Sequence, residues 1–286
     1  MPSLGDRPMA IAVVSGKGGA GKTSFSASLV LSRRGVTAVD ADVEEPNLAL
    51  LLGNPPMATM NATIPTPQVV DDLCARCGTC SRTCRFGAVF SFGQAPPVFN
   101  SLCHGCGACV LACPRGALYQ VDRPVGVIGR GVAGDAILVE GRLLVGNPNP
   151  VPVIHRAIEV GLAEGRDAVI DSPPGAACPM MAAVREADAV ILVTEPTPFG
   201  RADAEVAAQV LVELGKPTAL VVNRSGILEE DPPLGGILGT LPELARISFS
   251  RRVAEGYAVG VPPSAVNPSW AMAAESAWRW VMEVTG

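Results

Sequence analysis

The sequence is poor in charge, has no long apolar run and contains no Lys/Arg run of the kind that suggests a membrane surface. Charged residues make up 17% of its 286 positions and hydrophobic residues 48%. No apolar run reaches the roughly 18 residues that span a bilayer, and the apolar segment Ala189–Val193 is flanked by Asp188 and Glu195. The net charge of -5 offers no electrostatic attraction to nucleic acid. These absences argue against membrane insertion and against a nucleic-acid partner.

The first residues also lack an export signal. Met1–Pro8 has no long apolar stretch of the secretory kind, so we expect a cytoplasmic protein. Cytosolic thiols stay reduced, and the nine cysteines therefore indicate metal binding or catalysis rather than disulfides. Eight of the nine lie between Cys74 and Cys113, which marks this segment as a separate module.

Outside the cysteine-rich segment, apolar strands alternate with helices. We predict strands over Met9–Ser15, Val36–Asp42, Arg166–Asp171, Ala189–Thr194 and Pro217–Asn223, and helices over Gly21–Ser32, Met180–Glu186 and Arg201–Leu214. This alternation predicts an α/β fold with a mostly parallel sheet flanked by helices. We place this host domain at residues 1–64 and 123–286, and a small inserted α+β domain at 65–122. The segments Gln68–Val70 and Ala117–Val121 are expected to pair and to bring the ends of the insert together.

A glycine-rich segment follows the first predicted strand and opens the first helix. It reads Gly16, Lys17, Gly18, Gly19, Ala20, Gly21, Lys22, Thr23, and it fits the pattern G-x-x-x-x-G-K-[ST] in the strand-to-helix setting that this pattern requires. Backbone N–H groups of such a loop converge on phosphate oxygens, Lys22 would reach the β and γ phosphates, and the Thr23 hydroxyl would ligate Mg²⁺. The sequence thus predicts a site for ATP or ADP with Mg²⁺.

The cysteines form two copies of the spacing C-x2-C-x2-C-x3-C. The first run is Cys74, Cys77, Cys80 and Cys84, and the second is Cys103, Cys106, Cys109 and Cys113. In such pairs of runs the fourth cysteine ligates the other cluster, so we assign Cys74, Cys77, Cys80 and Cys113 to one 4Fe-4S cluster and Cys103, Cys106, Cys109 and Cys84 to a second. Zinc favours separated C-x-x-C pairs and fits this crowding less well. The module resembles bacterial ferredoxins over its whole length, although Arg85 replaces the usual proline after Cys84.

The early lysine of the glycine-rich segment carries a further resemblance. The form K-G-G-x-G-K-T, the segments Val39–Leu48 and Ala168–Gly175, and Val221–Arg224 resemble the deviant P-loop, the two switches and the adenine-contacting segment of the MinD and nitrogenase-iron-protein superfamily. The resemblance implies that Lys17 reaches the nucleotide of a partner subunit and that Asp42 orients the attacking water. It also implies that Asp40 and Asp171 hold the Mg²⁺ shell and that Asn223 contacts adenine. Gly239–Pro242, followed by an amphipathic helix, resembles the C-terminal region of this superfamily.

Each of these residues also has a plainer interpretation. Asp40 and Asp171 are compatible with ordinary strand-end or turn residues, Asn223 with a turn former, and Lys17 with a solvated loop lysine. Cys178 lies seven residues after Asp171, where the nitrogenase iron protein has a cluster cysteine, but no second cysteine outside the module completes such a shared site. We expect it either to be a small buried thiol or to lie near a dimer axis and help to hold a cluster or metal. His104, His155 and the tryptophans Trp270, Trp278 and Trp280 are interpreted as structural.

Several functions are consistent with these motifs. The leading one is a slow, partner-stimulated, Mg²⁺-dependent ATPase that forms a homodimer or a heterodimer with a related chain, and that couples nucleotide-driven conformational change to electron transfer or iron-sulfur chemistry with a partner protein. Alternatives are an Mrp-type carrier whose clusters are cargo and a positioning or scaffold ATPase. Corrinoid-type amidation, as in cobyrinic acid a,c-diamide synthase, is disfavoured because no glutaminase domain is evident.

Overall fold

The computed structural model describes residues 7–91, 96 and 98–286. Residues 1–6, on which the expected absence of an export signal partly rests, lie outside the described residues. The chain forms two compact units. The first comprises residues up to Thr59 together with Ile128–Arg142 and Ile154–Gly286, and the second comprises Met60–Val127 and Leu143–Val153. We had placed the insert at 65–122, within the longer of these two segments.

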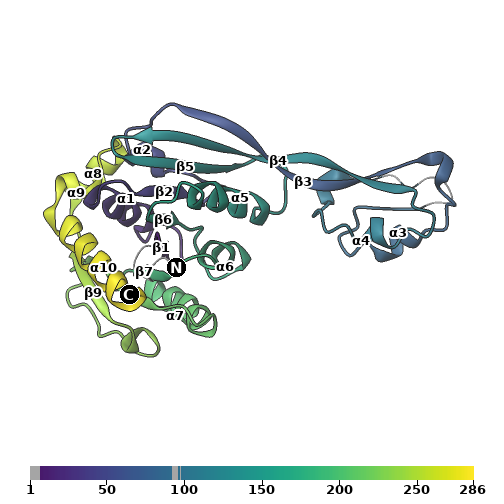
Figure 1. Cartoon of the computed structure of the whole chain (residues 1–286). Helices are drawn as coiled ribbons and strands as arrows, with labels where there is room; N and C mark the ends of the chain where they lie inside the picture. Colours follow the sequence, from purple (N-terminus) through teal and green to yellow (C-terminus); the bar gives the residue numbers. More distant parts are fainter. Residues whose placement is uncertain (1–6, 92–95, 97) are drawn as a thin grey trace. The chain divides into compact units, whose positions relative to one another are not determined.

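A nine-stranded sheet has the order β3-β4-β5-β2-β6-β1-β7-β8-β9 (Figure 1). The strands are β1 (Ala10–Val14), β2 (Thr37–Asp40), β3 (Met57–Val69), β4 (Leu118–Ala133), β5 (Ala136–Leu143), β6 (Ala168–Asp171), β7 (Ala189–Thr194), β8 (Thr218–Ser225) and β9 (Glu243–Ser248). From β5 to β9 every neighbouring pair is parallel. The expected α/β class with a mostly parallel sheet is therefore confirmed.

The helices of the first unit pack against both faces of this sheet. They are α1 (Lys22–Ser32), α2 (Leu48–Leu51), α5 (Val151–Leu162), α6 (Cys178–Val184), α7 (Pro198–Glu213), α8 (Arg251–Ala258), α9 (Pro263–Val266) and α10 (Pro268–Thr285). Ile11, Val13 and Ile191 point to the face on which α1 and α10 lie, and form one buried cluster with them. On the other face α5 approaches Val39 so closely that a Cβ added at Gly161 would lie 2.3 Å from Val39 Cγ2. Strands covered on both faces explain why the sequence has so few charged residues.

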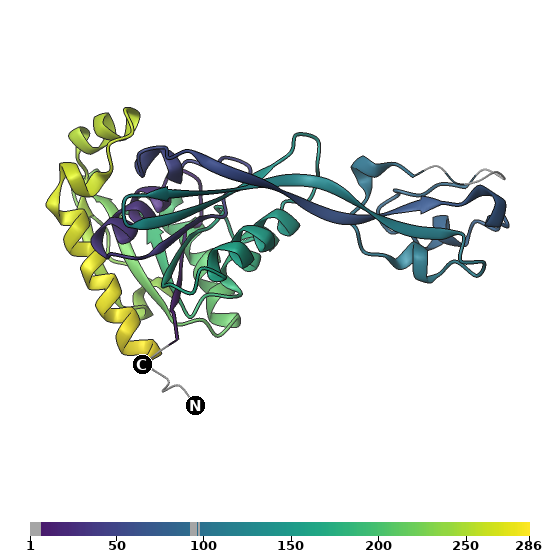
Figure 2. The same cartoon turned by 45° about the horizontal axis from the view of Figure 1, so that its top comes forward.

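Two parts of the sheet differ from the sequence-based expectation. β3 and β4 are long strands that run side by side (Figure 2), and only their ends, Gln68–Val70 and Ala117–Val121, had been recognised. These ends do pair, since Val70 N–H donates to Ala117 O at 2.8 Å. Strand β9 was not predicted: it lies between Gly239–Pro242 and the expected amphipathic helix, and it pairs with β8. The amphipathic helix α8 begins only at Arg251.

The second unit repeats one local structure twice. A short 3-10 turn (Asp71–Leu73) leads to the first cysteine loop and α3 (Thr79–Thr83), and another (Asn100–Leu102) leads to the second loop and α4 (Ala108–Leu111). Gly78 and Gly107 precede these helices with φ of 70° and 72°, a conformation that favours glycine. The internal duplication read from the cysteine spacing is thus present in the backbone. Over residues 7–91, 96 and 98–286, no helix combines the length and apolarity needed to cross a bilayer.

Packing between α1 and α10 depends on one buried tryptophan. The Trp278 indole N–H donates to Leu29 O at 3.1 Å, and the Arg33 guanidinium lies 4.8 Å from the ring centroid. We expect W278F to lower the free energy of unfolding by about 1–3 kcal/mol, because it removes this hydrogen bond and leaves unfilled volume. W280F is the matched control, since Trp280 is only partly buried against the same core and should cost less. Urea denaturation followed by circular dichroism measures both, and equal losses would contradict this assignment.

Candidate functional site

The glycine-rich loop lies between β1 and α1, and two of its glycines are required by close packing. A Cβ at Gly16 would lie 2.2 Å from the backbone carbonyl carbon of Asp203 in α7. A Cβ at Gly21 would lie 2.3 Å from Asn223 Nδ2, and Gly21 also has a φ of 102°. The loop is therefore fixed between α7 and the end of β8, with its residues at the start of α1, where a helix N-terminus favours anions.

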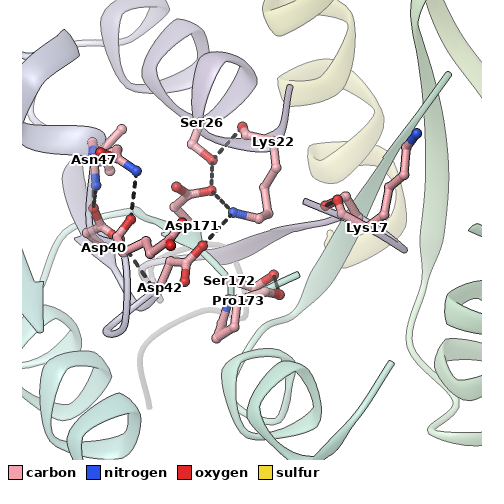
Figure 3. Close-up of polar contacts among 12 residues, drawn as sticks. Lys17, Lys22, Ser26, Asp40, Asp42, Asn47, Asp171, Ser172 and Pro173 are labelled. Carbon is pink, nitrogen blue, oxygen red and sulfur yellow. Dashed lines mark hydrogen bonds and ion pairs between the residues drawn. The ribbon is translucent and has the colours of Figure 1, made fainter. Parts of the chain in front are cut away.

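Lys22 is buried between two carboxylates from neighbouring strand ends (Figure 3). Its Nζ lies 3.4 Å from Asp42 Oδ2 and 3.4 Å from Asp171 Oδ1. Burial acts to lower the pKa of Lys22, but the charges of Asp171, Asp42 and Asp40 outweigh it, so that its pKa lies above its ordinary value. The lysine is thus held as a cation at the place where a triphosphate would bring negative charge.

Asp171 is oriented by a neighbour that the sequence did not reveal. Ser26 Oγ, on α1, donates to Asp171 Oδ1 at 2.9 Å. Asp171 Oδ2 is buried and has no hydrogen-bond partner within the described part of the chain. A buried, unpaired carboxylate oxygen is a suitable ligand for a hard cation such as Mg²⁺, directly or through a water molecule. The geometry at Asp171 therefore fits the predicted magnesium site.

Asp40 is bonded quite differently from Asp171. Its Oδ1 accepts from the backbone N–H of Asp42 at 3.1 Å, and its Oδ2 accepts from those of Asn47 and Leu48 at 2.9 Å each. The side chain is fully buried, and burial, followed by the charge of Asp171, raises the pKa of Asp40 well above its usual value. Through these bonds Asp40 holds the loop after β2 in place. Its predicted place in the Mg²⁺ shell stays a prediction.

A cavity of about 450 Å³ opens beside the loop and brings the expected residues together. Gly18, Gly19, Gly21, Lys22, Thr23, Asp42 and Asn223 line it, and so do Ile227, Phe249, Val253, Tyr257 and Trp270. Burial raises the pKa of Asp42, although Lys22 acts against this, and burial also raises the pKa of Tyr257. The aromatic and aliphatic wall is of the kind that binds a flat base. The sequence motifs do not reveal this wall, because Ile227, Phe249, Val253 and Tyr257 belong to none of them and Trp270 is interpreted there only as structural.

Asn223 lies at the cavity, but its amide also supports the loop. Its Nδ2 donates to Ala20 O at 2.9 Å, and its Oδ1 accepts from Arg224 N–H at 2.8 Å. These bonds fix the side chain while leaving one amide hydrogen for another acceptor. The predicted contact of Asn223 with adenine is compatible with this position and stays a prediction.

Lys17 points away from the cavity and pairs with a glutamate that sequence reasoning did not single out. Its Nζ contacts the Glu195 carboxylate at the end of β7 (Figure 3 shows the direction of the lysine). Glu195 also accepts from Thr197 Oγ1 at 2.8 Å and from Arg224 Nη1 at 2.9 Å. Burial raises the pKa of Glu195, but these donors and the charges of Lys17 and Arg224 more than offset it and lower the pKa. The interpretation of Lys17 as a solvated loop lysine is therefore wrong, and its role toward a partner subunit is untested.

The second unit brings the first predicted set of cysteines together and places Cys84, Cys103 and Cys109 of the second set near one another. Cys74, Cys77, Cys80 and Cys113 line one cavity. In the other set, burial raises the pKa of the Cys109 thiol and the nearby Cys103 and Cys84 add to the effect, which places Cys84 beside the second run. The fourth cysteines are bonded alike, since the backbone N–H of Ala88 and of Ala117 each donate to the Sγ four residues earlier at 3.3 Å. Four thiolates around one cavity, with N–H donors to sulfur, fit the ligation of a 4Fe-4S cluster.

Cys178 is exposed at the start of α6. The expectation of a small buried thiol is therefore wrong: the segment from Ser172 to Ala177 carries the chain out from β6, and the helix begins at its surface end. His104 stacks on Phe86, with ring centroids 3.9 Å apart and an interplanar angle of 12°, which agrees with a structural role.

Substitution of Asp40 and of Asp42 tests the different roles assigned to these two aspartates. In D40N, an amide replaces a carboxylate whose oxygens accept three backbone N–H groups, so one NH₂ must face a donor; we expect a loss of about 1–3 kcal/mol in the free energy of unfolding. D42N should unfold close to wild type and lower ATP turnover about 100-fold, because Asp42 lines the cavity. Urea denaturation and phosphate release measure the two effects. A fully stable D40N would contradict the role assigned to Asp40.

Comparison with known proteins agrees with both parts of this description. The family model of a 4Fe-4S dicluster domain matches residues 73–118. The uncharacterized protein MJ0578 of Methanocaldococcus jannaschii is 36% identical over 193 residues, which cover 66% of this chain and 68% of that protein. MJ0579 from the same organism is 28% identical over 257 residues, 88% of this chain and 90% of the other.

Solved structures agree on the fold. The cell division ATPase MinD of Pyrococcus furiosus matches with a TM-score of 0.58 and 20% identity, over 95% of this chain and 99% of the other. The septum site-determining protein MinD of Pyrococcus horikoshii, solved with Mg-ADP, matches with a TM-score of 0.56 and 20% identity, over 97% and 98% of the two chains. The chain therefore belongs to the family of MJ0578, and its fold is that of the MinD ATPases with an inserted 4Fe-4S dicluster domain.

Proposed function

We propose that the chain binds and hydrolyses MgATP as a dimer and uses nucleotide-driven conformational change to control electron transfer or iron-sulfur chemistry with a partner protein. One observation supports this proposal: a single chain holds both a cavity lined by Lys22 and Asp42, with Asp171 in contact with Lys22, and the four-cysteine cavity of the second unit. A scaffold ATPase would have no use for the cysteines. A carrier would need labile, accessible ligands; each set has one exposed cysteine, Cys77 or Cys106, but the complete ferredoxin spacing favours permanent clusters.

The residues of the cavity divide the work of phosphoryl transfer. The loop N–H groups and Lys22 would hold the β and γ phosphates, and Thr23 and Asp171 would hold Mg²⁺, which neutralises phosphate charge when bound. Asp42, close to Lys22 and open to the cavity, is placed to orient a water molecule for attack. Lys17 would have to leave Glu195 to reach the nucleotide of a second subunit. The eight module cysteines would hold two 4Fe-4S clusters, which supply one-electron chemistry.

Coupling between the two sites predicts a reciprocal effect. Anaerobically purified protein should contain about eight irons per chain, as two four-iron clusters require. If ATP shifts the potential of a cluster, reduction must shift ATP affinity by the same factor. We therefore expect ATP affinity to differ between oxidised and dithionite-reduced protein, measured by titration with a fluorescent nucleotide.

K22A supplies the control for this experiment. It should keep its iron but lose nucleotide binding, because it removes the buried cation of the phosphate site. Identical ATP affinities and turnover rates in the oxidised and reduced wild type would refute the coupling, and far fewer than eight irons would refute the cluster assignment.

Cys178 offers a narrower test of the same function. Because its thiol is exposed and lies outside the two cysteine sets, C178A should retain full iron content. If paired Cys178 thiols help to hold or pass on a cluster or metal in a dimer, C178A should lower redox-coupled ATP turnover and transfer of labelled iron to an apo-acceptor. Wild-type values in both assays would exclude this role.

A further inference from the structure

The cysteine-rich segment has a charge balance opposite to that of the remaining sequence. Residues 73–118 contain four arginines, Arg76, Arg82, Arg85 and Arg115, and no aspartate, glutamate or lysine. All 27 carboxylate side chains of the sequence lie elsewhere, and the nearest are Asp71, Asp72 and Asp122. Apart from the cysteines that would hold clusters, every charged side chain of this segment is an arginine, and exposed arginines attract acidic partners.

Three of the arginines surround the first four-cysteine cavity. Arg76 and Arg115 line it together with Cys74, Cys77, Cys80 and Cys113. Arg82 lies at its rim, where Nη1 donates to Cys77 O at 3.1 Å and Nη2 donates to Thr79 Oγ1 at 3.2 Å. All three residues are exposed, and none forms an ion pair with a carboxylate in the part of the chain that the structure describes. We call Arg76, Arg82 and Arg115 the arginine face.

The cysteines of the two sets differ in their exposure to solvent. Each set has one exposed cysteine, Cys77 in the first and Cys106 in the second, but no cysteine of the first set is buried, whereas Cys103 and Cys109 of the second are. The Phe86 and His104 rings, which stack on each other, follow Cys84 and Cys103 of the second set. Electron exchange between proteins needs a short path through the surface, and the first set offers it where the arginines gather.

We propose that the arginine face docks an acidic electron-carrier protein, with the carrier's redox group toward the cavity of Cys74, Cys77, Cys80 and Cys113. This inference rests on the proposed function and names the chemistry of its partner. Unpaired guanidinium groups at a rim steer a carboxylate-rich protein into contact, and they contribute mainly to association rate and orientation. A cluster's own negative charge would lie behind them, so an approaching partner meets the cations first.

A nucleic acid is the other polyanion to consider, and the surroundings disfavour it. Binding of single strands uses aromatic side chains as stacking platforms, but no aromatic residue is among the described residues that line this cavity. A small acidic protein need touch only the face itself.

The test uses the anaerobically purified full chain and an acidic flavodoxin as the probe. We expect the Kd of the complex between the chain and flavodoxin to rise steeply between low and physiological salt, because salt screens exposed charge pairs. R76N/R115Q should weaken binding about 10-fold at low salt, a loss typical of two contacting charges. Asparagine is chosen at position 76 because Arg76 has a φ of 56°. The matched control R252Q/R279Q removes two exposed arginines outside the segment and should bind as wild type.

Each outcome decides the proposal. No flavodoxin binding at low salt, or an equal loss in R252Q/R279Q, overturns it. A changed cluster potential with unchanged affinity in R76N/R115Q would mean that the arginines only balance cluster charge. Equal affinity for a single-stranded oligonucleotide, with the same sensitivity to R76N/R115Q, would replace the carrier by a general polyanion. If R76N/R115Q loses iron, R115Q alone provides the comparison. Eight irons and an intact ATP-redox coupling in the same preparation would leave the proposed function standing even where carrier binding fails.

Discussion

The arrangement of the first unit depends on a buried lysine that is balanced by the carboxylates of adjacent strand ends. Asp40 and Asp171 are register partners on β2 and β6, so the parallel sheet itself brings two acids side by side at its carboxyl edge. Such a pair is costly inside a protein unless a cation or hydrogen-bond donors compensate it. Lys22, at the first position of α1, supplies the cation, and the P-loop before it is thereby fixed against the sheet.

The three aspartates differ in how many hydrogen-bond donors and cations contact their carboxylates. This difference separates an aspartate that holds the backbone in place from those that remain available to a ligand. Asp40 receives three backbone N–H groups and keeps the loop after β2 in place. Asp171 receives one serine hydroxyl and one lysine, and retains a buried oxygen without a partner among the described residues. Asp42 is the one of the three that lines the cavity. A carboxylate whose oxygens all accept hydrogen bonds stabilises the structure around it, whereas one with an oxygen that lacks a partner is available to a cation or a water molecule.

Much of the fold and of the site can be predicted from short motifs. The features that depend on contacts between residues far apart in the sequence cannot. The P-loop, the two cysteine runs and the central strands follow from spacing and apolar runs within a few residues, and these determine the class of fold. Asp40 and Asp171 both end a strand in the sequence. Only the folded loop shows that the oxygens of Asp40 already accept three backbone N–H groups. Glu195 was passed over because its partners, Lys17 and Arg224, lie 178 and 29 residues away. The sequence does not predict β9, because its alternation is weak and its strand identity comes from pairing with β8.

The cysteine unit shows how a duplicated sequence becomes asymmetric. Both halves keep the turn, the glycine before the helix and the N–H to sulfur bond of the fourth cysteine, because cluster geometry constrains these features in the same way. The residues around them are not so constrained. Arg76 and Arg115 border the first set, while burial and an aromatic stack adjoin the second. Since charge, exposure and hydrogen bonding to sulfur set the potential of a cluster, two sets with equal ligands but unequal surroundings would give their clusters unequal potentials.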